Sequence, residues 1–181
     1  MKRTQNQKGY TLIESIMFIG VITAVSIGII NVVSSMLDRY KISRLTSQVA
    51  ELQKSINVRF AASENYKKLT AKLIKDENLA PGDISWEGEI MIHKYNGKVE
   101  VLPTLGNRAY EIKFNDLPKK PCMELAIQNW SHDQYSNLIH MKVNGVPAKW
   151  RNATYIMPLS VTQAETLCNS ELNNNIIWRF Q

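Results

Sequence analysis

The stretch that decides the fold lies near the start of the chain, where residues 7–37 read QKGYTLIESIMFIGVITAVSIGIINVVSSML. No charged residue occurs between Ser15 and Leu37, a run of 23 positions rich in Ile, Val and Met. A helix of that length reaches roughly 34 Å, slightly more than the hydrocarbon core of a bilayer at about 30 Å. The sequence therefore predicts a hydrophobic helix at residues 10–37 that can span a membrane.

The apolar pattern continues beyond this run but narrows to one stripe. Apolar residues recur there at steps of three or four, namely Ile42, Leu45, Val49, Leu52, Ile56 and Phe60. This spacing is typical of an amphipathic helix that buries one face. Because no Pro or Gly interrupts residues 29–62, we expect one continuous helix from about residue 10 to about residue 62. Its part at residues 38–62 would pack against a folded domain.

A basic start followed by apolar residues also occurs in secretory signal peptides and in single-pass anchors. The run here is longer than the usual apolar core of a signal peptide. Val33-Ser34-Ser35 is only a weak candidate for a cleavage site after it. A retained helix therefore explains the sequence better than a cleaved signal.

Residues 63–181 have the mixed pattern of an α+β domain. Asn96-Gly97 and Asn144-Gly145 each predict a β-hairpin, and Ser160 to Gln163 resembles a capping box that opens a helix. We expect helices at 65–78, 118–130 and 160–172 and strands at 89–95, 98–102, 109–114, 138–143, 146–150 and 176–180. The predicted fold is α+β, with a long N-terminal helix packed on an antiparallel sheet head and short helices at its margin.

Charge and cysteine content limit the possible partners and compartments. The formal net charge is +6, of which Lys2, Arg3 and Lys8 supply half. No dense Lys/Arg stripe with interleaved aromatic residues occurs, so we predict no nucleic-acid binding by the subunit itself. Cys122 and Cys168 are either two buried thiols or, in an oxidising compartment, one disulfide.

No constellation of catalytic or metal-binding residues is apparent. The histidines, His93, His132 and His140, have no metal-ligand spacing, and Ser131-His132-Asp133 is only sequence adjacency. Acidic residues at Asp76, Glu77 and Asp83 lack the alternating pattern of a calcium loop. The four tryptophans are expected in the core or at subunit interfaces, and we predict no enzyme activity, no metal and no cofactor.

Gly9, Tyr10 and Glu14 decide between the remaining readings. A short basic leader ending in Gly, an aromatic residue after it, a Glu four residues later and a membrane-length apolar run resemble the processing site of type IV prepilins. The resemblance implies a leader at residues 1–9, removed after Gly9 by a prepilin peptidase that also methylates the new amine of Tyr10. It implies that Glu14 sets the register of assembly by pairing with that amine, and that the remaining head extends over 63–181.

The head segments around Leu79-Ala80-Pro81, Leu117-Pro118 and Trp178 are most similar to those of type IVb, conjugative thin-pilus major pilins. In such heads two cysteines tie a C-terminal region to the sheet, which implies a Cys122–Cys168 disulfide.

The resemblance implies a precursor in the inner membrane, with its head in the periplasm. There it would meet lipid, the peptidase and the pilus assembly machinery before forming a helical homopolymer outside the cell. That filament could serve adhesion, motility or conjugation. Alternatives are a minor pilin, a type II secretion pseudopilin, or an anchored binding domain that does not polymerise.

Overall fold

The computed structural model describes residues 12–130, 137–149 and 153–181, with all of their side chains except those of Leu12 and residues 24–32. The chain divides into two compact units, Met1–Tyr40 and Lys41–Gln181. Helix α1 (Leu12–Phe60) begins in the first unit and ends in the second. The predicted continuous helix is therefore confirmed over the described residues.

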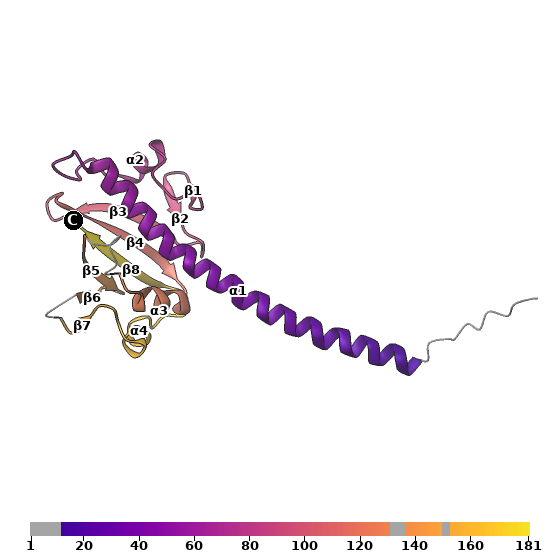
Figure 1. The fold of residues 1–181 in the computed structure, drawn as a ribbon. Coiled ribbons are helices and arrows are strands. Elements are labelled where there is room, and N and C mark those ends of the chain that lie inside the picture. The colour runs from indigo at the N-terminus through magenta and orange to yellow at the C-terminus, as the bar shows by residue number, and fades with distance from the viewer. Residues whose placement is uncertain (1–11, 131–136, 150–152) are drawn as a thin grey trace, which may run out of the picture. The chain divides into compact units, whose positions relative to one another are not determined.

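The C-terminal part of α1 forms one wall of the core of the second unit (Figure 1). Leu45, Val49, Leu52 and Ile56 are completely buried. They form the stripe that the spacing of three and four predicts, since such residues lie on one side of a helix. The hydroxyl of Tyr110 fixes this contact because it donates a hydrogen bond of 2.8 Å to the Asn57 Oδ1 of α1.

The described residues of the second unit form an eight-stranded sheet in the order β1-β2-β3-β4-β8-β5-β6-β7, whose strands are labelled in Figure 1. The strands are β1 (Ser85–Glu87), β2 (Ile90–Ile92), β3 (Lys98–Thr104), β4 (Ala109–Leu117), β5 (Leu138–Val143), β6 (Val146–Lys149), β7 (Tyr155–Ile156) and β8 (Asn174–Phe180). Neighbouring strands are antiparallel except β6 and β7, which are parallel.

The register of the strands sorts side chains onto two different faces. One row across five strands is buried throughout and consists of Val101, Ile112, Trp178, Met141 and Ala148. These residues join the α1 stripe in a single hydrophobic core. Because side chains alternate along a strand, the next row faces away from α1. We call that side of the sheet the outer face.

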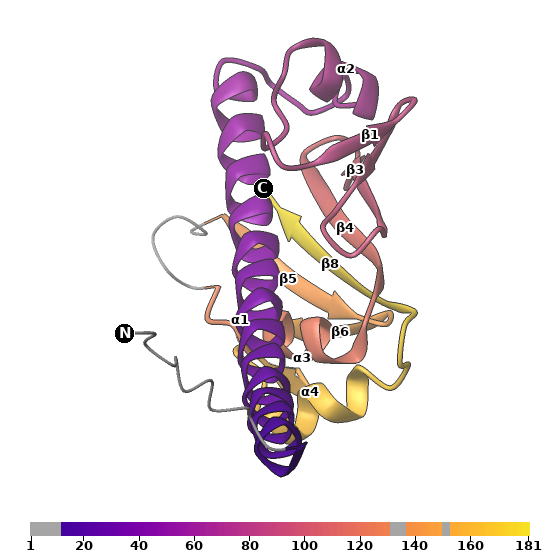
Figure 2. The ribbon, with the colours of Figure 1, turned by 90° about the vertical axis from the view of Figure 1, so that its right-hand side faces the viewer.

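Three short helices complete the head, namely α2 (Ala71–Asp76), α3 (Lys119–Ile127) and α4 (Val161–Leu167). Thr70 caps α2, and Ser160 with Gln163 forms the predicted capping box of α4. Pro118 precedes α3, which turns Cys122, Leu125 and Ala126 into the core. In Figure 2, α3 and α4 lie near the point where β4 ends and β8 begins.

Several expected boundaries are wrong. The helix predicted at 65–78 is only α2, because residues 65–69 form turns and Thr70 caps the helix that follows. The helix predicted at 160–172 ends at Leu167, where Cys168 is the C-cap. The final strand lies in the middle of the sheet, between β4 and β5. The short strands β1 and β7 have no strong apolar alternation and were not predicted.

Candidate functional site

The N-terminal part of α1 exposes apolar side chains on all sides. Every side chain from Ile13 to Thr23 is exposed, and consecutive residues of a helix cover its whole circumference. The large apolar side chains that are exposed between Ile13 and Leu37 are those of Ile13, Ile16, Met17, Phe18, Ile19, Val21, Ile22, Val33, Met36 and Leu37. We call them the exposed helix surface. So large an apolar area on a protein marks a surface that another molecule or a membrane covers.

Glu14 lies in the first turn of α1, where the partial positive charge of the helix N-terminus favours a carboxylate. Gly9 and Tyr10 lie outside the described residues. Among the residues described, no helix combines the length and apolar character needed to cross a membrane.

The two cysteines form a disulfide between α3 and the end of α4. Cys122 and Cys168 are both buried, and their Cα atoms are 5.9 Å apart. The bond joins residues 46 positions apart in the sequence. It ties the segment that leads into β8 to the segment that follows β4, as the sequence resemblance implied.

Asn174 reinforces the same junction, although its role was not predicted from the sequence. Its buried amide nitrogen donates to the Leu117 carbonyl over 3.0 Å, and its Oδ1 accepts from Ser170 N and from Asn144 Nδ2. Asn144 in turn accepts a hydrogen bond of 2.8 Å from the Asn175 amide. A buried side chain with all its polar atoms paired holds a loop in one conformation. The Asn-rich run 173–175 is the only sequence signal for this network.

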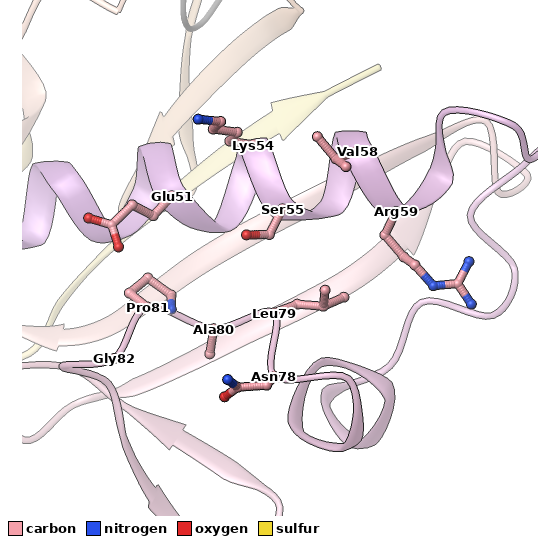
Figure 3. A pocket seen from close by; sticks show the side chains of 10 residues that line it. All are labelled: Glu51, Lys54, Ser55, Val58, Arg59, Asn78, Leu79, Ala80, Pro81 and Gly82. Atoms are coloured by element: carbon pink, nitrogen blue, oxygen red, sulfur yellow. The ribbon is translucent and has the colours of Figure 1, made fainter.

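A groove of about 510 Å³ lies in the second unit between α1 and the loop that follows α2 (Figure 3). Its lining residues are Glu51, Lys54, Ser55, Val58 and Arg59 from α1, and Asn78, Leu79, Ala80, Pro81 and Gly82 from the loop. Figure 3 shows Val58 on the helix side and Leu79 on the loop side of the groove. No local pattern in the sequence indicates this groove, because the residues of its two walls are 19 or more positions apart.

Two ion pairs hold the loop of this groove against α1. Arg59 forms a bidentate pair with Glu77, with Nη2 2.9 Å from Oε1, and this hydrogen bonding lowers the pKa of Glu77. Arg44 Nε donates to Asp83 Oδ2 over 2.9 Å. Burial alone would raise the pKa of Asp83, but the hydrogen bond from Arg44 and the positive charges of Arg44 and Lys94 lower it overall. Both carboxylates are thus engaged with arginines.

His93 has a structural role. Its Nδ1 accepts from the Tyr95 amide over 3.1 Å, so the proton lies on Nε2, which donates to the Asn115 carbonyl over 2.7 Å. Burial, partly offset by the Asn115 bond, lowers the pKa of His93. Gly97 packs so closely here that a Cβ atom would lie 2.1 Å from the Asn115 oxygen. The first hairpin therefore closes around a buried imidazole.

The remaining residues with possible chemistry are dispersed. Within the part of the chain that the structure describes, no three His, Cys, Asp or Glu side chains come together as metal ligands. Trp130 and Trp178 are buried with their ring centres 5.1 Å apart, and Trp86 is half-buried. His132 and Trp150 lie outside the described residues.

Comparisons with known proteins agree with this architecture. The sequence matches the family described as PilS N terminal over residues 39–181. Comparison with curated proteins finds no match. Among solved structures, the fold is similar to that of TcpA, a type IV pilin from Vibrio cholerae El Tor biotype, with a TM-score of 0.57 and 10% sequence identity. That similarity covers 78% of this chain and 99% of the TcpA chain. The chain thus belongs to the PilS N-terminal family and has the fold of a type IV pilin.

Proposed function

We propose that the protein is the structural subunit of a type IV pilus, of the type IVb class, and that it polymerises through the N-terminal part of α1. Before assembly, the exposed helix surface would lie in the inner membrane with the head in the periplasm. After assembly, the same surface would be covered by the helices of neighbouring subunits, and the heads would form the outside of the filament. The subunit itself carries out no catalysis.

The observation that carries this proposal is the exposed helix surface itself. Ile19 is 63% exposed, and its apolar neighbours on every side of the helix are similarly exposed. Covering an apolar side chain of this size is favourable by about 1.5–3 kcal/mol. A helix that protrudes from one subunit and packs against neighbouring copies makes a heterologous contact. When such a contact repeats without closing into a ring, it produces a helical polymer. Membership of the PilS N-terminal family and the pilin fold support the same function.

Processing at Gly9 would supply the polar part of the assembly contact. Cleavage after Gly9 creates an ammonium on Tyr10, which the peptidase would methylate. This cation can pair with Glu14 of its own chain or of a neighbouring subunit. At 4 Å and an effective dielectric constant of about 20, such a pair attracts by roughly 4 kcal/mol before desolvation is subtracted. A subunit with the wrong stagger would lose that attraction, so Glu14 would select one register.

Intact mass measurement tests the processing step. The protein purified from its host is expected to begin at Tyr10, to carry one added methyl group and to gain two hydrogens on reduction of the disulfide. The Gly9→Val variant is expected to retain the mass of the full precursor, because the bulky residue blocks the peptidase. A wild-type protein that still begins at Met1, or that is cut beyond Leu37, would contradict processing.

Electron microscopy of sheared cell-surface material tests polymerisation. Wild-type cells are expected to yield filaments in which this chain is the most abundant protein. Glu14→Gln is expected to be processed normally but to give few filaments, whereas Glu64→Gln, the same substitution on an exposed loop of the head, is expected to assemble normally. A trace amount of the chain in the filaments would favour a minor pilin. Complete absence from filaments would favour an anchored domain.

A further inference from the structure

The outer face of the sheet carries an unequal distribution of charge. One row in register across β3, β4, β8, β5, β6 and β7 consists of Leu102, Glu111, Arg179, His140, Lys149 and Ile156. The adjacent row contains Glu100, Lys113, Ile177, Lys142 and Pro147. The carboxylates therefore lie on β3 and β4, and the cations extend from β4 to β6.

Two of these cations are neutralised by carboxylates of the same face. Arg179 Nε donates to Glu111 Oε1 over 2.8 Å, and Lys113 Nζ lies 3.5 Å from Glu100 Oε2. Lys142 and Lys149 form no ion pair within the described part of the chain. Residues opposite each other on antiparallel strands have Cβ atoms about 5 Å apart, so His140 lies directly between Arg179 and Lys149. Two positive charges without a carboxylate partner among the described residues thus lie over β5 and β6.

His140 is unusual for a polar residue in this position. It is only 6% exposed, and its Nε2 is buried without a hydrogen-bond partner. Leaving a buried polar atom without a partner costs about 1–3 kcal/mol, which most sites avoid. Burial, and then the positive charges of Arg179, Lys142 and Lys149, lower the pKa of His140 to about 4, against a smaller opposing effect of Glu111. The imidazole is therefore neutral at physiological pH, with one N–H to donate.

We propose that Lys142, Lys149 and His140 form a binding site for a tetrahedral dianion, either phosphate or sulfate. Two lysine ammonium groups match the two negative charges of such a group, and charge-assisted hydrogen bonds from ammonium to oxyanion are among the strong ones. The lysine side chains are flexible, so both ammonium groups can close on an oxyanion that lies beside the imidazole. Arg179 remains paired with Glu111 and contributes only the electrostatic effect of its charge.

The site can be tested by NMR on the full chain in non-ionic detergent, with labelled histidine. Sulfate and phosphate are titrated separately at pH 7, with sodium chloride adjusted to keep the ionic strength constant. Both the His140 ring signal and the His140 pKa are expected to respond in a saturable manner, with the pKa rising because the anion favours the imidazolium. The His93 signal, which comes from another part of the sheet, is expected to stay unchanged. Response to only one of the two anions would identify the ligand more narrowly.

Matched variants separate binding from general screening. The double variant Lys142→Gln, Lys149→Gln is expected to weaken the apparent affinity at least tenfold, and each single variant by less. Lys72→Gln removes the same charge from α2 and is expected to bind as the wild type does. An unchanged His93 signal in every variant checks that the head is folded. The proposal is wrong if acetate or chloride moves the His140 signal as much as sulfate and phosphate do, or if the double variant binds as the wild type does.

Discussion

The two parts of helix α1 differ in how their apolar side chains are arranged and in what surrounds them. Between Leu45 and Phe60 the large apolar side chains other than Val58 form one stripe, and the sheet of the same chain buries it. Between Ile13 and Leu37 the described apolar side chains surround the helix and are exposed. The sheet of the same chain thus covers the C-terminal part of α1, whereas the described residues of the chain do not cover its N-terminal part.

This difference shows how one helix can serve two purposes. An amphipathic stripe can be satisfied by one sheet face, so it folds with the subunit. One face of a sheet cannot bury a helix that is apolar on all sides. Such a helix is suited to a membrane or to a bundle of identical helices. Substitutions in the two parts should accordingly change different properties, namely the folding of the head or the proposed assembly.

The largest effect is expected from removing the disulfide, which belongs to the head alone. The double variant Cys122→Ala, Cys168→Ala should lower the free energy of unfolding of the head by about 4 kcal/mol, because a cross-link over 46 positions restricts the unfolded chain. Urea unfolding of the full chain in non-ionic detergent, followed by the fluorescence of the buried tryptophans, measures this change. Reduction of the wild-type protein should give a similar loss. An unchanged urea midpoint in both cases would mean that the junction is held by Asn174 instead.

A pair of matched substitutions compares the two parts of α1 directly. Ile56 is completely buried and Ile19 is 63% exposed. Ile56→Ala should lower the free energy of unfolding by about 3 kcal/mol, since it leaves a cavity in the core. Ile19→Ala should leave the urea midpoint of the head unchanged while reducing filament yield. If both variants unfold at the same urea concentration, the distinction between the two parts of the helix is wrong.

The sequence predicted the features that local rules control. The extent of α1, the Asn144-Gly145 turn and the Ser160 capping box depend on neighbours a few residues apart, and all three are present. The first hairpin also forms, but its connection covers residues 93–97 and not only Asn96-Gly97. The disulfide was implied by family resemblance, because sequence spacing alone left free thiols possible. Gly9, Tyr10 and Glu14 remain predictions as processing and assembly residues.

Features that depend on distant contacts were missed or wrong. Strand β8 lies in the interior of the sheet because it pairs with both β4 and β5. No local pattern in residues 174–180 indicates these two pairings. In the first hairpin Met91 pairs with Val99 and is buried, and Ile92 is also buried while Ile90 is exposed. The loop around His93 ends the regular pairing there, so simple alternation does not give the inward residues.

A change of pH should alter the free energy of unfolding of the head by an intermediate amount. The effect comes from a histidine, and residues 12–40 contain none. The folded pKa of His140, about 4, is below the unfolded value near 6.5. The unfolded state therefore binds more protons between these values, so stability is full above pH 6.5 and is lost as the pH falls toward 4. With a discount for solvent screening, we expect a loss of roughly 1–2 kcal/mol at pH 5. Urea unfolding at pH 7 and pH 5 measures it.

His140→Gln is the control for that pH effect. The variant should lose less stability between pH 7 and pH 5 than the wild type, because glutamine takes up no proton. Carboxylates titrate in both proteins, so the difference between them isolates the histidine. Equal pH dependence in the two proteins would show that the pKa of His140 is not lowered by folding.

The smallest effect concerns the hydrogen bond that joins the sheet to α1. Tyr110 is fully buried and donates to Asn57 Oδ1 over 2.8 Å, whereas Tyr40 is 61% exposed on the same helix as Asn57. Tyr110→Phe keeps the ring in the core and removes only the hydroxyl, so it should lower the free energy of unfolding by about 1 kcal/mol. Tyr40→Phe should change the free energy of unfolding by a few tenths of a kcal/mol at most. Because Asn57 is half-buried, water can replace the lost donor and keep the cost small. If Tyr110→Phe lowered the free energy of unfolding by well above about 2 kcal/mol, this hydroxyl would organise the whole contact between α1 and the sheet. Apolar burial would then contribute less to that contact than the comparison of the two helix parts implies.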